Sequence, residues 1–347
     1  MSIFKKSLNN AKIRVMAKSI KTEPKEDLQI DVVLRPSCWN DYIGQDRVKN
    51  NIQIIIEAAK KRKGLPDHLL FYGQHGLGKT TLANLIAKEM TANLRVVSGV
   101  SLEKSGDLVA VLANLEKGDV LFIDEAHRLN RMIEEILYPA MESRKMYITV
   151  GKGPAAKMLS IDLPPFTLIA ATTRVNLLSA PLRSRFGAIF NLEYYELKEV
   201  EKIIMRSAQI LGLKLNDEAI AMVARASRFT PRTANRLLKR IRDFAEVNNH
   251  KIITAEVVME TFKMLDIDEI GLEKSDRKLL EIIIKKFQGG PVGLNTLSAV
   301  LGEDRGIIEE VHEPFLLKTG LLIKASHGRV ATNDAYKHLN LEKYQVE

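Results

Sequence analysis

Five short segments of strand character lie between residues 68 and 192, and helical patterns separate most of them. The segments cover residues 68–72, 94–98, 120–123, 167–171 and 188–192. Several are continuous apolar runs, which is typical of parallel strands buried on both faces. Helical spacing is expected over residues 46–61, 81–90, 108–115 and 128–143. Strands alternating with helices predict an α/β domain around a parallel sheet.

The pattern changes after residue 195. Amphipathic helices are expected over residues 199–211 and 217–226, and a third helix begins at Thr230-Pro231-Arg232, with Thr230 as N-cap. From about residue 268, helices over 276–286, 294–301 and 306–319 precede a short hairpin of residues 321–324 and 329–332. We therefore expect an N-terminal arm (1–29), a large α/β domain (30–195), an all-helical lid (196–267) and a C-terminal winged helix (268–347).

The first α/β junction carries a phosphate-binding motif. Residues 73–80, GQHGLGKT, fit G-x-x-x-x-G-K-[ST] between a strand and a helix. Glycines let several N–H groups point at one anion, and the helix N-terminus favours negative charge. Lys79 is expected to reach the β- and γ-phosphates of a nucleotide, and Thr80 to hold Mg²⁺.

A second motif follows the strand at 120–123. The stretch DVLFIDEAH (119–127) ends in Asp124 and Glu125. Ligands of open α/β sheets lie at the carboxyl ends of the strands. Asp124 is therefore expected beside Mg²⁺, and Glu125 is expected to polarise the attacking water. The strand at 167–171 ends in Thr172-Thr173 at the same edge.

Charge and composition limit the possible partners. The chain has 347 residues, a net charge of +9 and 27% charged residues, a soluble composition compatible with nucleic acid as a partner. Residues 1–29 hold seven Lys/Arg against three Asp/Glu, and they are expected to form either a disordered arm or an accessory DNA-binding tail. No apolar run is long enough for a membrane span, no secretion signal is evident, and one cysteine excludes an internal disulfide. We expect an intracellular protein.

Two further segments leave alternatives open. Strand patterns at 146–150 and 158–161 flank GKGPAAK (151–157), which indicates a protruding β-hairpin or a plain loop. The turn PLRSRFG (181–187) carries Arg183 and Arg185, which are either solvated charge or a phosphate contact. Lys324 and Arg329 on the C-terminal hairpin are either wing contacts to DNA or ordinary edge-strand charge.

The whole set of motifs resembles the RuvB family of AAA+ ATPases, the bacterial motors of Holliday-junction branch migration. The resemblance runs from about residue 34 to residue 338. It is carried by LRP (34–36), YIGQ (42–45), GLGKTTLA (76–83), GDVLFIDEAHRL (118–129), GKGPAAK (151–157), PPFTLIAATTR (164–174), PLRSRFG (181–187), TPR (230–232), GGPVGL (289–294) and AYKHL (335–339).

The resemblance implies roles for individual residues. Thr173 matches sensor 1, Arg185 the arginine finger that reaches a neighbour's nucleotide, and Arg232 sensor 2 on the lid. With Lys79, Asp124 and Glu125, these form the implied catalytic set. Implied nucleotide-binding residues are Leu34, Arg35, Gly76, Gly78, Lys79, Thr80, Thr81, Glu142, Ser143, Arg144, Arg185, Tyr195 and Arg232, with Thr80 and Asp124 on the metal and Lys324 and Arg329 on DNA.

The resemblance also implies partners. It implies ATP and Mg²⁺, a homohexameric ring, duplex DNA at a four-way junction, RuvA docked on the hairpin at 146–161, and RuvC resolvase as a further possible partner, all in the bacterial cytoplasm without a membrane. An ATP-switched scaffold or clamp-loader-like protein is the alternative. An RNA helicase is disfavoured although residues 124–127 spell DEAH, because no second series of buried strands follows Leu192.

The chain departs from the family pattern at several positions. Gln74 and His75 stand where the family usually has two prolines, and these side chains are not needed for the N–H cradle. In the family pattern the helix at this place ends in acidic and aromatic residues, whereas the corresponding residues here are Glu142-Ser143-Arg144. In the wing, Lys324 and His327 replace positions that are usually arginine, and a lysine lacks the bidentate fork of arginine.

Overall fold

The computed structural model describes residues 25–150 and 157–341, in two units that divide after Pro36. The first unit contains α2 (Lys25–Leu34), so the last residues of the predicted arm are helical. Residues 1–24 lie outside the described residues. The sequence pattern missed α2 because its apolar residues do not form one stripe, and Val32 and Val33 are exposed.

The second unit begins with a five-stranded parallel sheet in the order β2-β3-β6-β1-β7. The strands are β1 (Leu69–Tyr72), β2 (Leu94–Ser98), β3 (Val120–Asp124), β6 (Thr167–Thr172) and β7 (Ala188–Asn191). In β3, Phe122 packs into one buried apolar cluster and Leu121 into another. Successive side chains therefore serve the two faces of the sheet, as the strand period requires.

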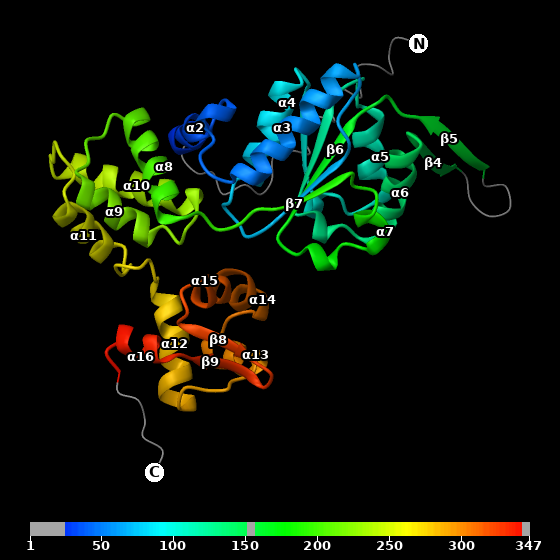
Figure 1. The fold of residues 1–347 in the computed structure, drawn as a ribbon. Helices are drawn as coiled ribbons and strands as arrows, with labels where there is room; N and C mark the ends of the chain where they lie inside the picture. The colour runs from blue at the N-terminus through cyan, green and yellow to red at the C-terminus, as the bar shows by residue number, and fades with distance from the viewer. Residues whose placement is uncertain (1–24, 151–156, 342–347) are drawn as a thin grey trace, which may run out of the picture. The chain divides into compact units, whose positions relative to one another are not determined.

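Helices cover both faces of this sheet (Figure 1). The first cluster includes residues from α3 (Asp46–Lys61) and α4 (Lys79–Glu89), and the second includes residues from α5 (Ser105–Ala113), α6 (Arg131–Glu142) and α7 (Ala180–Arg183). Short 3₁₀ turns occupy 39–41, 99–101, 126–128 and 175–177. The predicted parallel α/β core is confirmed.

A two-stranded antiparallel hairpin extends from the core after α6 (Figure 1). It consists of β4 (Lys145–Val150) and β5 (Lys157–Asp162), and residues 151–156 at its tip lie outside the described residues. Tyr147, Met158, Leu159 and Ile161 are exposed on it. The hairpin interpretation of this segment is therefore the correct one, and the plain loop is excluded.

Four helices form the lid, one more than the three that the sequence pattern predicts. They are α8 (Leu197–Ile210), α9 (Asp217–Ala226), α10 (Pro231–Val247) and α11 (Ala255–Met264). Thr230 caps α10, because its Oγ1 accepts a hydrogen bond from the Thr233 N–H at 3.3 Å. Apolar residues of these helices belong to the same buried cluster as α3 and α4.

The C-terminal part combines helices with a two-stranded hairpin around its own buried cluster. Its elements are α12 (Lys274–Phe287), α13 (Leu294–Leu301), α14 (Arg305–Ile307), a π-helical turn (Ile308–His312), α15 (Glu313–Lys318), β8 (Leu322–Ala325), β9 (Gly328–Ala331) and α16 (Asn333–His338). The winged-helix prediction is confirmed, but the single helix expected over 306–319 is interrupted by the π-helical turn.

A buried charge network adjoins this turn. His312 Nδ1 lies 2.6 Å from Asp276 Oδ1, and Asp276 also accepts a hydrogen bond from Arg228, which lies between α9 and α10 of the lid. Burial disfavours both charged forms, but the mutual hydrogen bond and nearby charges outweigh it, so the pKa of His312 is raised and that of Asp276 lowered. Helical periodicity does not reveal such a polar pairing.

Candidate nucleotide-binding site

The phosphate-binding loop joins β1 to α4, and its backbone requires glycine. Gly73, Gly76 and Gly78 all have positive φ, between 80° and 141°. A Cβ at Gly76 would lie 2.8 Å from the Cβ of Arg232, and one at Gly78 would lie 2.8 Å from the Tyr42 hydroxyl oxygen. Both the left-handed conformation and the close approach of neighbours exclude larger side chains. Arg232 of the lid is thus placed against the loop, beside the expected phosphate site.

Lys79 folds back over this loop. Its Nζ donates hydrogen bonds to the carbonyl oxygens of Gly73 at 2.8 Å and Gln74 at 2.9 Å. Burial lowers the pKa of Lys79 to about 8, although Asp124 and Glu125 act in the opposite direction. The Lys79 ammonium group therefore lies at the phosphate-binding loop, hydrogen-bonded to two carbonyl oxygens that a phosphate could replace. An anionic phosphate would stabilise the charged form of Lys79.

Thr80 and Asp124 come together at the end of β3. Thr80 Oγ1 donates to Asp124 Oδ2 at 3.4 Å, and Asp124 Oδ1 accepts from the Glu125 N–H at 2.9 Å. Nowhere in residues 25–150 and 157–341 are three or more His, Cys, Asp or Glu side chains gathered as metal ligands. One hydroxyl and one carboxylate fit Mg²⁺, which keeps waters and binds through phosphate oxygens instead of all-protein cages.

Glu125 stands between two histidines. Its Oε2 lies 3.3 Å from His127 Nδ1 and its Oε1 lies 3.5 Å from His75 Nδ1. His127 Nδ1 also lies 3.0 Å from Thr172 Oγ1, which ties the carboxylate to the neighbouring strand β6. Burial lowers the pKa of His127, against the opposing effect of Glu125.

Thr173 follows Thr172 at the carboxyl edge of β6. Its Oγ1 is buried and has no hydrogen-bond partner among the described residues. A buried hydroxyl without a partner is costly in a folded protein unless a ligand or water satisfies it. This atom therefore fits the predicted role of sensing a γ-phosphate.

Tyr195 joins the lid to the phosphate-binding loop. Its hydroxyl donates to the Leu77 carbonyl oxygen at 3.2 Å, and its oxygen lies 3.4 Å from the Tyr42 hydroxyl oxygen. Burial raises the pKa of Tyr195 to about 12, so the phenol stays protonated and able to donate. The prediction that Leu34 and Arg35 border the base stays a prediction, because they belong to the first unit.

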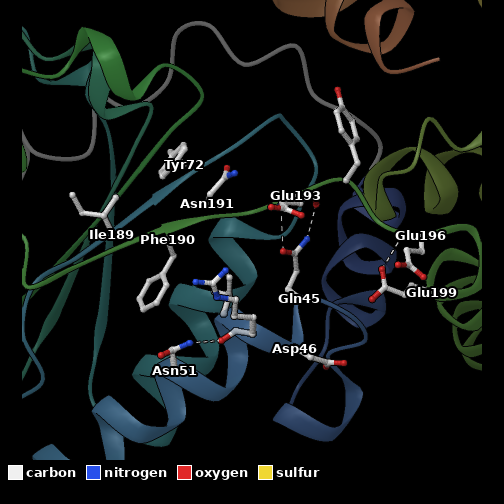
Figure 2. Close-up of a pocket in the computed structure, with 13 residues that line it drawn as sticks. Gln45, Asp46, Asn51, Tyr72, Ile189, Phe190, Asn191, Glu193, Glu196 and Glu199 are labelled. Atoms are coloured by element: carbon white, nitrogen blue, oxygen red, sulfur yellow. Dashed lines mark hydrogen bonds between the residues drawn. The ribbon is translucent and has the colours of Figure 1, made fainter. Parts of the chain in front are cut away.

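A pocket of about 570 Å³ is lined by residues of β7, the first turns of α3 and the segment that leads into α8 (Figure 2). Gln45 spans it, donating from Nε2 to the Glu193 carbonyl oxygen at 2.6 Å and accepting from the Glu193 N–H at 3.2 Å. The lining includes Tyr72 and Asn191 but no residue between 73 and 80. The pocket therefore lies outside the phosphate cradle, and Gln45 connects the start of α3 to the segment that leads into the lid.

Arg185 lies at another edge of the core. Its Nε is 3.1 Å from Glu142 Oε1, its Nη1 donates to the Pro181 carbonyl oxygen at 2.6 Å, and its guanidinium carbon is 4.4 Å from the centre of the Tyr138 ring. These contacts, within the part of the chain that the structure describes, do not include the phosphate-binding loop. The role of Arg185 as an arginine finger stays a prediction.

The remaining residues predicted to bind the nucleotide lie either at the phosphate-binding loop or near Arg185. Thr81 is in the first turn of α4, beside Thr80. Glu142 contacts Arg185, and Ser143 Oγ donates to the Pro139 carbonyl oxygen at 3.0 Å. Arg144 follows with a positive φ of 55°. Contact of residues 142–144 with a nucleotide stays a prediction.

The wing residues differ in exposure. Lys324 has a side chain that is 55% exposed, with Nζ 3.9 Å from Glu313 Oε2. Arg329 is buried instead, because its Nε donates to Glu313 Oε1 at 2.6 Å and its Nη2 to Glu309 Oε1 at 3.4 Å. The expected free guanidinium on the wing is therefore absent at Arg329. DNA contact stays a prediction for both residues. Lys324 would need less side-chain rearrangement than Arg329 to reach DNA.

The parallel sheet carries a phosphate-binding loop, paired carboxylates and a sensor threonine at one edge, and an arginine of the helical lid lies against the loop. These features define a nucleotide-binding domain of the AAA+ class. Three family models match the chain in order: the Holliday junction DNA helicase RuvB P-loop domain over residues 34–192, the RuvB AAA lid domain over 195–268, and the RuvB C-terminal winged helix domain over 269–340. The chain belongs to the RuvB family.

Solved structures agree with this assignment. Thermotoga maritima RuvB, described as a Holliday junction branch migration motor, has 47% sequence identity and a TM-score of 0.82, covering 89% of this chain and 99% of its own. A lysine-to-arginine mutant of it gives the same identity, coverage and TM-score, and a proline-to-glycine mutant gives a TM-score of 0.83. In the described residues, none of the helices combines the length and apolarity needed to cross a membrane.

Sequence reasoning did not identify every residue at the site. His127 was read only as part of the DEAH string, and His75 only as a substitution for proline. Tyr42 was quoted only within the YIGQ motif. The loops after β1 and β3 bring His75 and His127 to one edge of the sheet, and Tyr42 lies in the segment before α3, with its hydroxyl beside Gly78 and Tyr195. The signal in the sequence that could have identified these three residues is that each is polar and lies in or beside a recognised motif.

Proposed function

We propose that this protein is an ATP-driven motor that moves the branch point of four-way DNA junctions together with RuvA. The observation that carries the proposal is the convergence of Lys79, Thr80, Asp124, Glu125 and Thr173 at one sheet edge, with Arg232 of the lid across the loop. Membership of the RuvB family supplies the DNA substrate and the partner.

In the proposed hydrolysis, the loop N–H groups and Lys79 bind the β- and γ-phosphates. Glu125 orients and polarises the attacking water, and Thr173 donates to a γ-phosphate oxygen. Mg²⁺ bound through Thr80 and Asp124 would neutralise developing charge on the phosphates. Catalysis of this kind consists mainly of positioning and electrostatics, so these few groups suffice.

The proposed assembly is a homohexameric ring, with RuvC as a possible further partner. Arg185 would complete the site of a neighbouring subunit, and its separation from its own loop supports this role. The β4–β5 hairpin would dock on RuvA through Tyr147, Met158 and Leu159, since exposed apolar side chains mark an interaction surface.

A scaffold or clamp-loader-like switch is not favoured, because all three RuvB family models match in order. The helicase reading of DEAH also lacks support. The two other sheets in the described part of the chain have two strands each, so no second motor-like sheet is present there.

The deciding experiment is branch migration of a synthetic four-way junction, with and without RuvA. We expect ATP-dependent conversion to duplex products that RuvA stimulates, and none with the matched Glu125→Gln variant. ATP hydrolysis without conversion in any arm would contradict the proposed function while leaving the ATPase assignment intact.

A further inference from the structure

We propose that His75 is a positioning residue for ATP hydrolysis, acting through Glu125. This inference rests on the proposed function, in which Glu125 orients the attacking water. His75 Nδ1 lies 3.5 Å from Glu125 Oε1, and His127 Nδ1 lies 3.3 Å from Oε2. The two imidazoles therefore face the two oxygens of one carboxylate from opposite elements, the phosphate-binding loop and the turn after β3.

The Glu125 carboxylate needs contacts from other side chains because the Glu125 backbone does not fix its orientation. Its φ of 51° places it in the left-handed region, directly at the end of β3, and its side chain is 28% exposed. A glutamate side chain has several rotatable bonds, and one contact leaves the carboxylate free to turn about that contact. Two contacts from different sides define both its position and the direction of its remaining lone pairs.

The two histidines are not equivalent. The His127 side chain is only 6% exposed and is held by Thr172 Oγ1 at 3.0 Å. His75 is 43% exposed on a loop that surrounds the expected phosphates, so it is the partner that can respond to bound nucleotide.

The contact depends on the histidine side chain, because a proline at this position would have no side-chain donor. His75 therefore adds a contact to Glu125 that a loop with proline there could not make, while the N–H cradle is unchanged.

The test compares His75→Ala with His75→Asn in the full-length protein. Asparagine places its amide nitrogen close to where Nδ1 of histidine stands, so it keeps a donor but cannot titrate. We expect His75→Ala to lower kcat about 3- to 10-fold, because the Glu125 carboxylate then has one neighbouring side chain fewer to fix its orientation. The KM and the equilibrium affinity for ATP should change less than about twofold, and His75→Asn should restore most of kcat.

His250→Ala is the matched control, because His250 is an exposed histidine that follows the end of α10, the helix whose opposite end carries Arg232, and it stacks on Phe244. It should keep the kcat of the unchanged protein. Thermal unfolding and ring assembly of each variant separate a folding defect from a catalytic one.

Three results would overturn the inference: an unchanged or increased kcat in His75→Ala, a His75→Asn variant as slow as His75→Ala, or a loss confined to ATP affinity. If the unchanged protein hydrolyses ATP and Glu125→Gln does not, such a result removes the role of His75 alone. Absence of ATPase in the unchanged protein would instead remove the proposed function and this inference with it.

Discussion

In the proposed mechanism, individual residues at the site divide into groups that bind the nucleotide and groups that act only during hydrolysis. Lys79 is buried, rests on two loop carbonyls and has a pKa lowered by burial, so its position suits phosphate binding. Glu125 lies farther along the same edge and contacts histidines instead of the cradle. Substitutions at these two positions should therefore fail in different ways.

The first prediction separates these failures. Lys79→Ala should weaken ATP binding about 10- to 100-fold and abolish hydrolysis, because a charged hydrogen-bond donor to phosphate is lost. Glu125→Gln should bind ATP normally and lose at least about 10²-fold in kcat, since an amide cannot act as the base. A fluorescent nucleotide titration and a steady-state ATPase assay measure the two effects. Equal loss of binding in both variants would contradict the assignment.

At the scale of elements, the wing is a small hairpin attached to its domain by charge pairs. Glu313 at the start of α15 is buried and accepts a hydrogen bond from Arg329 of β9, and the exposed Lys324 of β8 stands near the same carboxylate. Removing one partner of a buried pair leaves the other charge uncompensated, which costs about 3–5 kcal/mol. An exposed lysine has no comparable role in stability.

The second prediction follows for the wing. Lys324→Ala should weaken duplex DNA binding for all sequences, reduce the salt dependence by about one counterion, and leave thermal unfolding unchanged. Arg329→Ala should lower the unfolding temperature of the C-terminal domain, because Glu313 loses its partner. DNA titrations at several salt concentrations and calorimetry of both variants measure these effects. If Lys324→Ala binds DNA as the unchanged protein does, Lys324 is not a DNA contact.

At the scale of the whole molecule, the proposed active site is shared between subunits of a ring. Arg185 contacts Glu142, Pro181 and Tyr138, while Lys79 and Thr80 belong to the loop after β1. A guanidinium supplied by a neighbour to the γ-phosphate is worth about 10³–10⁵ in rate in related nucleotide hydrolases. A subunit with a damaged finger should therefore still bind ATP.

The third prediction uses this division. Arg185→Ala and Lys79→Ala should each lack ATPase, but mixing them should restore part of it, because some intact fingers then face intact sites. The measurement is the ATPase rate against mixing ratio, with assembly followed by light scattering. If mixed rings form and exchange subunits but give only the sum of the two variant rates, Arg185 does not act in trans, and Arg183 becomes the next candidate.

Sequence periodicity and motif spacing were sufficient for the class of fold and the centre of the site. Buried strands such as 120–123 and the glycine loop at 73–80 have local physical signals, because burial on both faces and positive φ restrict residue types directly. Asp217–Ala226 and Leu294–Leu301 were predicted with the bounds that the structure shows, since each has a clear apolar stripe with polar neighbours.

Only the tertiary structure decided which polar side chains meet. Arg329 and Lys324 look alike as wing charges, but Glu313 lies 16 residues before Arg329 and its burial can be seen only in the folded domain. His75 and Glu125 are separated by 50 positions and meet because parallel strands end at one edge. The sequence by itself determined most of the elements, their order and the position of the phosphate-binding loop, but not α2 or α11. The pairing of charges was decided by packing, because electrostatic contacts depend on distances between elements and leave no period along the chain.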